Sequence, residues 1–262
     1  MGPIEEHLVY VSDAVRLDAY RRAVFATIRP GARVADLGCG TGILGLFCLQ
    51  AGASAVFGID ATPMIDIARE SIARAGLEGS ATWFRAPSSR VELPERVDLV
   101  ICDQVGNFGF DARIVHDLSD ARRRFLKPGG AIIPRRIRLH LAGVEAPALY
   151  ARADAGGREP VPNPFRWVRG RAVNTTYPVR LSADQLLLAP AVLGDLDLYT
   201  ERDRVHSWHV TLRASRAGVL HGLAGWFECE LADGIWMSNS PLATAPINRS
   251  QAFLPLGEPI GL

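Results

Sequence analysis

The chain of 262 residues has almost no lysine, no excess charge and no long hydrophobic run. Lys127 is its only lysine, and arginine supplies the remaining basic side chains. A formal net charge of +1 gives no electrostatic reason to expect binding to nucleic acid or to an anionic membrane surface. No apolar run approaches the ~18 residues of a membrane span. We therefore expect neither a nucleic-acid partner nor a membrane partner.

Cysteine is also scarce, and none of it has the spacing of a metal site. No CxxC pair or zinc-spaced His/Cys cluster is present. The HSWH run at 206–209 is a poor metal pair, because residues three apart in a strand face opposite sides. We therefore expect no metal and a cytoplasmic protein whose thiols are reduced and buried: Cys39, Cys48, Cys102 and Cys229. The opening residues MGPIEEHLVY lack the pattern of a secretory signal.

The first half of the chain alternates strand and helix patterns. Short apolar runs predict buried strands, and longer runs with helical apolar spacing end at glycine. The predicted strands are 32–38, 54–60, 97–103 and 131–134, and the predicted helices are 43–52, 63–76 and 116–130. This rhythm predicts an α/β fold with a doubly wound, mostly parallel sheet.

The second half changes character after Pro134. Period-two patterns dominate, for example in 206–214 and 220–231, and helical periodicity is scarce. The sequence therefore predicts two domains, an α/β domain over 1–134 and an antiparallel β-barrel-like domain over 135–262.

The strongest local signal is VADLGCGTG at 34–42. An acid ends the strand, and Gly38, Gly40 and Gly42 open the next helix. Glycine lets a backbone turn sharply and approach a ligand without a Cβ in the way. The spacing is GxGxG, so it fits neither a dinucleotide fingerprint nor a P-loop. Asp60 ends the second strand, where a carboxylate can accept hydrogen bonds from two vicinal ribose hydroxyls.

These motifs together resemble the class I S-adenosylmethionine (AdoMet) methyltransferases, and more closely the protein arginine methyltransferases. DLGCGTGILGLFCLQAGASAVFGID resembles the donor-binding core of that family over its full length. HLVYVSDAVRLDAY resembles its N-terminal helix, LHGLAGWFECEL resembles its barrel, and FLKPGGAIIPRR also matches the family. The resemblance covers most of the chain. It implies a Rossmann-like donor domain at 1–134, a substrate and dimerisation domain at 135–262, and a homodimer.

The same resemblance assigns the donor site residue by residue. Arg16 would pair with the methionine carboxylate of AdoMet, for which a guanidinium fork is suited. Asp36 would support the turn and the amino end of the donor, and Asp60 would hold the ribose. The full set expected to bind AdoMet is His7, Arg16, Asp36, Gly38, Gly40, Gly42, Asp60, Ser88 and Ser89. The two serines fall where relatives carry an acid that contacts adenine.

The acceptor loop CDQVGNFGFD at 102–111 departs from the family. Relatives use two glutamates to clamp a guanidinium. Here Asp103 stands at the first, and the second falls on Ala112, one residue after Asp111. Aspartate is shorter by one methylene, about 1.5 Å of reach, and methyl transfer needs reacting atoms within about 3–3.5 Å. We expect Asp103 to orient the acceptor, Asp111 to assist and Asn107 to contact the acceptor.

Two further residues are candidates for the acceptor side. His116 lies near the acceptor loop and could act as a general base. Arg249 lies in INR at 247–249, where relatives have Thr-His-Trp, and its charge would repel a cationic acceptor; it could equally point to solvent. The family helix that precedes His7 has no counterpart here, so we expect a more open acceptor groove or one completed by a partner.

These departures lead to three hypotheses about function. The first is methyl transfer from AdoMet to a nitrogen or oxygen of a small molecule or short peptide in bacterial specialised metabolism. The second is methylation of free or protein arginine with a remodelled, aspartate-based clamp. The third comes from another class of protein, an AdoMet-binding scaffold without catalysis.

Overall fold

The computed structural model describes residues 3–157 and 159–262. The chain forms two compact units. The first contains the chain up to Ile137 and two later segments, Leu196–Val205 and Cys229–Met237. The second contains Arg138–Asp195, His206–Glu228 and Ser238–Leu262.

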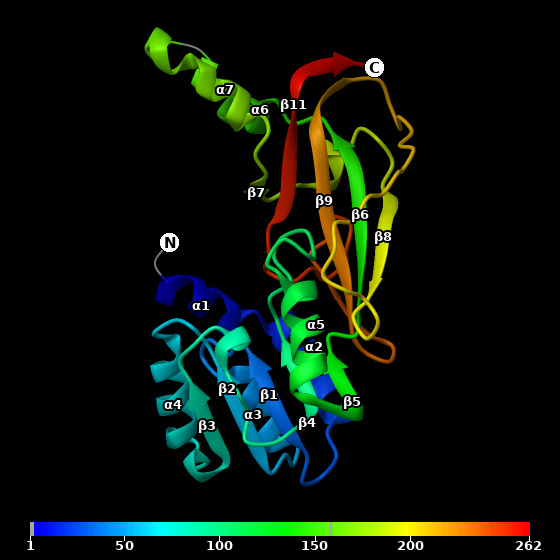
Figure 1. Cartoon of the computed structure of the whole chain (residues 1–262). Coiled ribbons are helices and arrows are strands. Elements are labelled where there is room, and N and C mark those ends of the chain that lie inside the picture. The colour runs from blue at the N-terminus through cyan, green and yellow to red at the C-terminus, as the bar shows by residue number, and fades with distance from the viewer. Residues whose placement is uncertain (1–2, 158) are drawn as a thin grey trace. The chain divides into compact units, whose positions relative to one another are not determined.

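The first unit is built on a five-stranded sheet in the order β3-β2-β1-β4-β5 (Figure 1). Every neighbouring pair in it is parallel. The strands are β1 (Arg33–Leu37), β2 (Ala55–Ile59), β3 (Ala81–Phe84), β4 (Val97–Cys102) and β5 (Leu126–Ile133). Nearly all residues of β1, β2 and β4 are buried, as their unbroken apolar runs require. The predicted doubly wound parallel sheet is confirmed.

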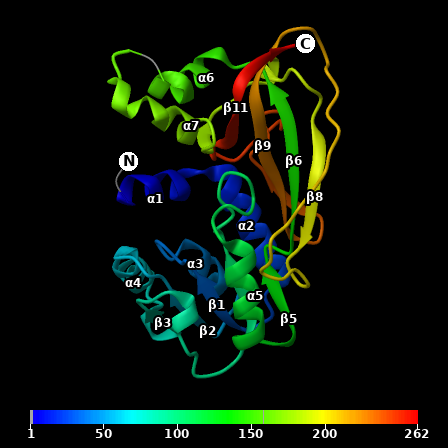
Figure 2. The same cartoon turned by 45° about the horizontal axis from the view of Figure 1, so that its top comes forward.

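Helices connect and cover this sheet. They are α1 (Pro3–Ser12), α2 (Ala14–Thr27), α3 (Ile43–Gln50), α4 (Met64–Arg74) and α5 (Ile114–Arg124), with short 3-10 turns η1 (Glu78–Ser80) and η2 (Ser88–Arg90). The chain leaves β1 toward β2 in one direction and β4 toward β5 in the other. Right-handed crossovers therefore place α3 and α4 on one face and α5 on the opposite face (Figures 1 and 2).

The segment 116–130 differs from its prediction. Helix α5 ends at Arg124, and β5 already begins at Leu126 and runs through Pro128-Gly129-Gly130. Buried Phe125 ends the helix, and Leu126 pairs with Val97 of β4. The register then shifts by Leu99, so the Pro-Gly-Gly run lies within an irregular stretch of strand rather than at a helix end.

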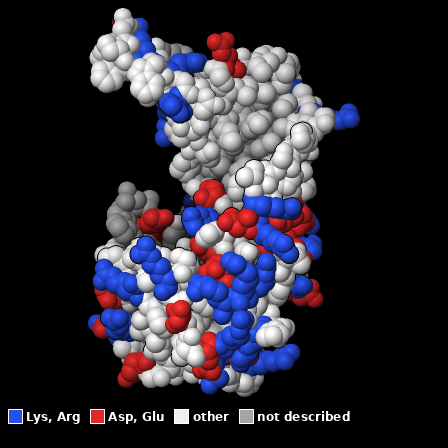
Figure 3. Space-filling model, in the orientation of Figure 1, with Lys and Arg blue, Asp and Glu red and all other residues white. Residues whose placement is uncertain are grey.

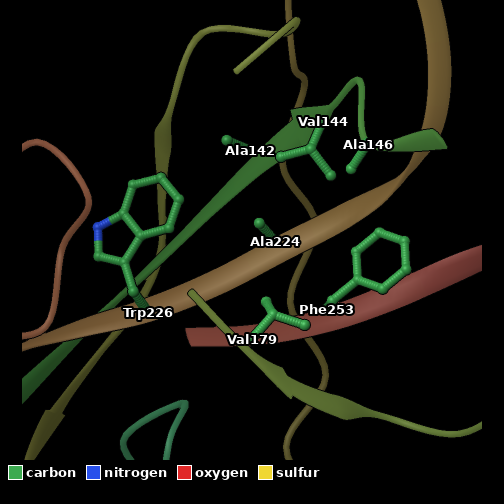
Figure 4. Packing of buried hydrophobic residues seen from close by; sticks show 7 residues of the cluster. All are labelled: Ala142, Val144, Ala146, Val179, Ala224, Trp226 and Phe253. Atoms are coloured by element: carbon green, nitrogen blue, oxygen red, sulfur yellow. The ribbon is translucent and has the colours of Figure 1, made fainter. Parts of the chain in front are cut away.

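The second unit contains most of an antiparallel sheet, with strand order β7-β11-β9-β6-β8 and β10 paired to β9. The strands are β6 (Arg136–Val144), β7 (Tyr177–Val179), β8 (Ala191–Asp197), β9 (Val219–Ala232), β10 (Ile235–Ser238) and β11 (Gln251–Gly261). Trp226 and Phe253 pack with small and branched side chains in its core (Figure 4). This sheet confirms the predicted antiparallel second part.

Helical turns separate β6 from β8. They are α6 (Pro147–Asp154), η3 (Ala155–Gly157), η4 (Asn163–Val168), α7 (Arg169–Ala172) and η5 (Ala183–Gln185). The prediction of a strand over 206–214 is wrong. That segment makes only an isolated bridge, between Ala214 and Leu188. Its period-two pattern lacks a neighbouring strand with which it could complete a ladder.

The first unit is completed by segments that come after residue 134. Arg122 donates from its guanidinium to the backbone oxygens of Leu198 (2.6 Å) and Glu201 (2.8 Å). The backbone N–H of Ile132 in β5 donates to the hydroxyl of Tyr199 (3.0 Å). These contacts cover the edge strand of the sheet. The domain boundary at 134 stays a prediction, and the compact units divide the chain at 137 and return two later segments to the first unit.

Candidate active site

Three acids meet at one edge of the parallel sheet. Asp36 lies near the end of β1, Asp60 follows β2 and Asp103 follows β4. Strand β1 is the middle strand of the three, and Asp36 is in register with Gly58 of β2 and Ile101 of β4. Ligands of open α/β sheets bind at the carboxyl ends of the strands, where the strand order reverses. That point here lies between β1 and β4.

A glycine turn follows β1 at the same edge. The φ angles of Gly38, Gly40 and Gly42 are +62°, +51° and +77°, values that residues other than glycine rarely adopt. A Cβ on Gly40 would lie 2.6 Å from Cε1 of His7, and one on Gly38 would lie 2.8 Å from Cδ of Gln104. The predicted glycines therefore form a tight turn against these two side chains, His7 from α1 and Gln104 from the loop after β4.

Asp36 is a buried carboxylate with one oxygen open. Its Oδ2 accepts from the backbone N–H of Gly45 at 3.0 Å, and its Oδ1 has no hydrogen-bond partner. The pKa of Asp36 is raised to about 7, chiefly by burial; the Gly45 N–H acts to lower it and the charge of Asp60 acts to raise it. An unpaired buried oxygen beside a glycine turn fits a ligand that brings a hydrogen-bond donor, such as an ammonium group.

Asp60 stabilises the glycine turn by hydrogen bonds within the protein. Its Oδ2 accepts from the Gly40 N–H at 2.8 Å. Its Oδ1 accepts from the N–H and hydroxyl of Thr62 at 2.8 and 2.7 Å. Two carboxylate oxygens have about four acceptor sites. Three of them are used within the protein, so Asp60 fixes the glycine turn and keeps limited capacity for a ribose hydroxyl.

Asp103 forms a buried network with two side chains of α2. Arg16 donates to its Oδ2 from Nε at 2.7 Å and lies 2.5 Å from it through Nη2. Tyr20 donates from its hydroxyl to Oδ1 at 2.8 Å. Burial of Tyr20 and the charge of Asp103 both raise the pKa of the phenol. Arg16 also donates to the backbone oxygen of Tyr10 at 3.2 Å. Both oxygens of Asp103 are therefore engaged, and its charge is compensated.

The acceptor loop is organised by Asp111. Its carboxylate accepts from the backbone N–H groups of Asn107 (3.1 Å) and Phe108 (2.9 Å). Gly106, with φ of +65°, packs so closely that a Cβ would lie 2.0 Å from Oδ1 of Asp111. This geometry favours a structural role for Asp111. The predicted catalytic role of Asp111 and the predicted acceptor contact of Asn107 stay predictions.

The predicted adenine-side serines lie in η2. Ser88 is half-buried and Ser89 is exposed. Arg124 of α5 donates to the backbone oxygens of Ser88 (2.7 Å) and Val91 (2.6 Å), which fixes the turn. The backbone that carries the two serines is therefore fixed by Arg124. The contact of the serine hydroxyls with adenine stays a prediction.

His116 lies on the first turn of α5 and is partly exposed. Its Nδ1 lies 2.6 Å from Oδ2 of Asp203, and its Nε2 lies 3.9 Å from Asp117. Burial raises the pKa of Asp117, and the charges of Arg113 and His116 lower it. The predicted role of His116 as a general base stays a prediction.

Arg249 belongs to the second unit and is buried rather than turned to solvent. Its backbone oxygen accepts from the guanidinium of Arg180 at 2.8 Å. The neighbouring Asn248 accepts from the same guanidinium at 2.5 Å. The predicted acceptor contact of Arg249 stays a prediction.

Two residues of the candidate site, Tyr20 and Gln104, were not assigned a role from the sequence. Tyr20 lies four residues after Arg16, so a helix presents both side chains on one face, which is a usable signal. Gln104 had no such signal, because its position over Gly38 depends on the turn after β4.

Among the residues that the structure describes, no group of three or more His, Cys, Asp or Glu could hold a metal ion. Within the same residues, no helix is long and apolar enough to cross a membrane.

The family model described as "Methyltransferase domain" matches residues 34–130. The probable protein arginine N-methyltransferase 6 of Arabidopsis thaliana is 29% identical over 236 residues, covering 86% of this chain and 54% of that protein. The protein arginine N-methyltransferase 6 of Xenopus laevis is 28% identical over 239 residues, covering 84% and 68%. The chain thus spans about half the length of the first relative and two thirds of the second.

A solved structure with a similar fold is the Trypanosoma brucei PRMT1 enzyme–prozyme heterotetrameric complex with AdoHcy. Its TM-score is 0.85 at 22% identity, covering 98% of this chain and 83% of that one. At this identity the likeness concerns the fold. Together with the matched domain, it confirms the predicted class I methyltransferase fold. The two relatives confirm the resemblance to arginine methyltransferases.

Proposed function

We propose that this chain, an arginine methyltransferase-like class I methyltransferase by domain and fold, transfers a methyl group from AdoMet to a nitrogen acceptor. The matched methyltransferase domain spans β1 to the Pro-Gly-Gly run of β5 and contains all three acids of the candidate site. The observation that carries the proposal is the open Oδ1 of buried Asp36 beside the glycine turn. AdoMet is the donor of this class of enzyme and brings an ammonium group to such a position.

The residues at this edge divide the binding of the donor among them. Asp36 would accept from the ammonium group, and the Cβ-free turn at Gly38 and Gly40 lets the ligand approach the backbone. Arg16 uses three of its five N–H donors on Asp103 and Tyr10, which leaves two for the ligand carboxylate. His7, packed against Gly40, would lie against the bound donor.

AdoMet supplies an activated methyl group, and the acceptor nitrogen displaces its sulfur while losing a proton. The protein's part is to align the acceptor with that methyl group. Holding two reactants in a reactive geometry supplies about 7–11 kcal/mol of a barrier. Asp103 is fixed at the carboxyl end of β4 by Arg16 and Tyr20, so it can orient an acceptor N–H without moving.

We propose arginine in a peptide or protein as the acceptor, because the similar proteins are named as arginine methyltransferases. A specific observation favours a second candidate, a neutral nucleophile on a small molecule or short peptide. The charge of Asp103 is compensated by Arg16, and Ala112 supplies no second carboxylate. A cationic guanidinium would therefore find less negative charge here than two free glutamates provide.

One pair of peptides separates these candidates. The protein is incubated with labelled AdoMet and an arginine-containing peptide, the same peptide with lysine in place of arginine, or pools of neutral small molecules. Methylation is followed by mass spectrometry. Methylation of the arginine peptide alone supports the first acceptor. Methylation only in pools of neutral small molecules supports the second. Binding of S-adenosylhomocysteine (AdoHcy) without any transfer would favour the non-catalytic scaffold.

The role of Asp103 is tested on the same acceptor. We expect Asp103→Asn to lower kcat at least ~100-fold, a typical effect of removing an acid–base group, while AdoHcy affinity by calorimetry changes much less. Asp111→Asn is the matched control in the same loop, and it should lower stability more than kcat. A parallel loss of AdoHcy affinity and kcat in Asp103→Asn would instead mean that Asp103 only positions Arg16.

The predicted homodimer also remains a proposal. The segment between β6 and β7 exposes Phe165 and Trp167 on short helical turns. Large exposed aromatic side chains are typical of interaction surfaces. Substituting both by serine and measuring mass by light scattering tests whether this segment joins two copies.

A further inference from the structure

A cavity of the first unit lies near the amino ends of β4 and β5, whereas the three acids lie at the carboxyl ends of the strands. Its volume is about 540 Å³. Arg96 directly precedes β4, and Lys127 is the second residue of β5, so both cations flank amino ends of neighbouring strands. The lining contains three cations and no carboxylate: Arg96, Arg122, Leu126, Lys127, Pro128, Gly129, Gly130, Ala131 and Tyr199. Figure 3 shows Lys and Arg atoms gathered over α5 and β5 on this face.

The two arginines are held in place by neutral partners. Arg96 donates to the backbone oxygens of Leu126 (2.6 Å) and Arg123 (3.0 Å). Arg122 donates to those of Leu198 (2.6 Å) and Glu201 (2.8 Å). Each guanidinium has five N–H donors, so each keeps three for another partner. Backbone carbonyls fix the geometry of these guanidinium groups without neutralising their charge.

Other charged and polar groups also lie around the cavity. Lys127 pairs with Asp98 at 2.7 Å, and the Asp98 carboxylate also accepts from the Arg33 N–H. Tyr199 accepts a hydrogen bond from Ile132, so its own hydroxyl hydrogen can point to a ligand. Asp197 and Glu201 are the acids that act on the charge of Arg122, whose pKa is lowered first by burial.

We propose that this cavity binds the phosphoryl group of a small soluble molecule, between the Arg96 and Arg122 guanidinium groups. Two fixed guanidinium forks match the oxygen geometry of a phosphoryl group and form charge-assisted hydrogen bonds with it. Preordering by carbonyl groups means that little side-chain entropy is lost on binding. The volume also accommodates more than a single phosphate. This inference does not depend on the methyl-transfer proposal, because the cavity lies at the amino ends of the strands and the donor site at their carboxyl ends.

The test uses inorganic pyrophosphate as the probe and the full chain with saturating AdoHcy. Calorimetry should show one pyrophosphate site whose affinity falls at least tenfold in Arg96→Gln and severalfold in Lys127→Gln. Arg74→Gln is the matched control, because Arg74 is exposed on α4 and pairs with Glu70. Its affinity for pyrophosphate should equal that of the unchanged protein.

Several results would overturn the proposal. One is the absence of pyrophosphate binding at millimolar concentration to the unchanged protein. Another is an equal loss in Arg96→Gln and Arg74→Gln, which would indicate diffuse attraction to surface charge. Pyrophosphate binding that appears only when AdoHcy is left out would place the anion in the donor site. Binding of a polyglutamate peptide but not pyrophosphate, lost in Arg96→Gln, would assign the cavity to acidic protein segments. If Arg96→Gln does not fold, Lys127→Gln decides alone.

Discussion

At the scale of single residues, Asp36 couples the candidate donor site to pH. Its folded pKa of about 7 lies above its ordinary value of 3.8. The folded chain then holds a proton that the unfolded chain has lost, so the free energy of unfolding falls as pH rises from about 4 to 7. The difference corresponds to about 4 kcal/mol of unfavourable charge burial above pH 7. A bound ammonium group offsets this cost.

We therefore predict that the affinity for AdoHcy rises with pH. Only the deprotonated Asp36 accepts well from an ammonium group, so affinity should increase about ten- to thirtyfold from pH 5.5 to 8 and release a proton. Calorimetry in buffers of different ionisation enthalpy measures both effects. Asp36→Asn should bind weakly at every pH and show a flatter dependence of unfolding on pH. A pH-independent affinity in the unchanged protein would contradict the role given to Asp36.

At the scale of elements, the loop after β4 contains two glycines with positive φ, Gly106 and Gly109. Gly106 has φ of +65°, and a Cβ there would meet the Asp111 carboxylate. Asp111 in turn holds the N–H groups of Asn107 and Phe108. The Asp111 carboxylate and the open backbone position at Gly106 therefore both contribute to the loop conformation. The catalytic candidate Asp103 lies at the first residue of this loop, which links loop geometry to chemistry.

We predict that Gly106→Ala lowers the free energy of unfolding by about 2–4 kcal/mol, because it combines left-handed backbone strain with a steric clash. Gly76→Ala is the matched control. Gly76 has φ of +70°, but nothing lies within 4 Å of its Cβ position, so only the strain of about 1 kcal/mol should appear. Urea unfolding measures both variants. Equal losses would mean that the Asp111 contact relaxes without cost.

The elements also show why some sequence patterns failed. The Pro-Gly-Gly run after α5 has the composition of a helix end, yet it lies within β5, because Leu126 pairs with Val97 before the run begins. The 206–214 segment has a strand pattern but forms no ladder. In both cases a distant segment decided the outcome, and local composition carries no information about distant partners.

At the scale of the whole molecule, the first unit is assembled from three parts of the chain. It contains the chain up to Ile137 and two later segments, Leu196–Val205 and Cys229–Met237, which follow residues of the second unit. Leu198 donates from its N–H to the Arg135 oxygen at 2.9 Å, and Arg135 donates to the Glu230 oxygen at 2.9 Å. Without these segments, edge strand β5 would expose backbone groups that the full chain satisfies.

We predict that a fragment of residues 1–137 is less stable than the same region in the full chain. Amide hydrogen exchange should show faster exchange in β5 of the fragment, with the largest change at Ile132, whose N–H loses the Tyr199 hydroxyl. Tyr199→Phe in the full chain is the control, and it should accelerate exchange at Ile132 alone. Unchanged protection throughout β5 in the fragment would show that residues 1–137 fold independently.

The sequence by itself determined the parallel sheet, the glycine turn and the acids at the strand ends. These features are local, since buried strands, left-handed turns and strand-end carboxylates each depend on a few neighbouring residues. Only the tertiary structure decided that Arg16 pairs with Asp103, 87 residues away, and that Asp36 keeps an open oxygen. Partners of buried charges depend on which distant segments meet, and that is fixed by packing rather than by the pattern along the chain.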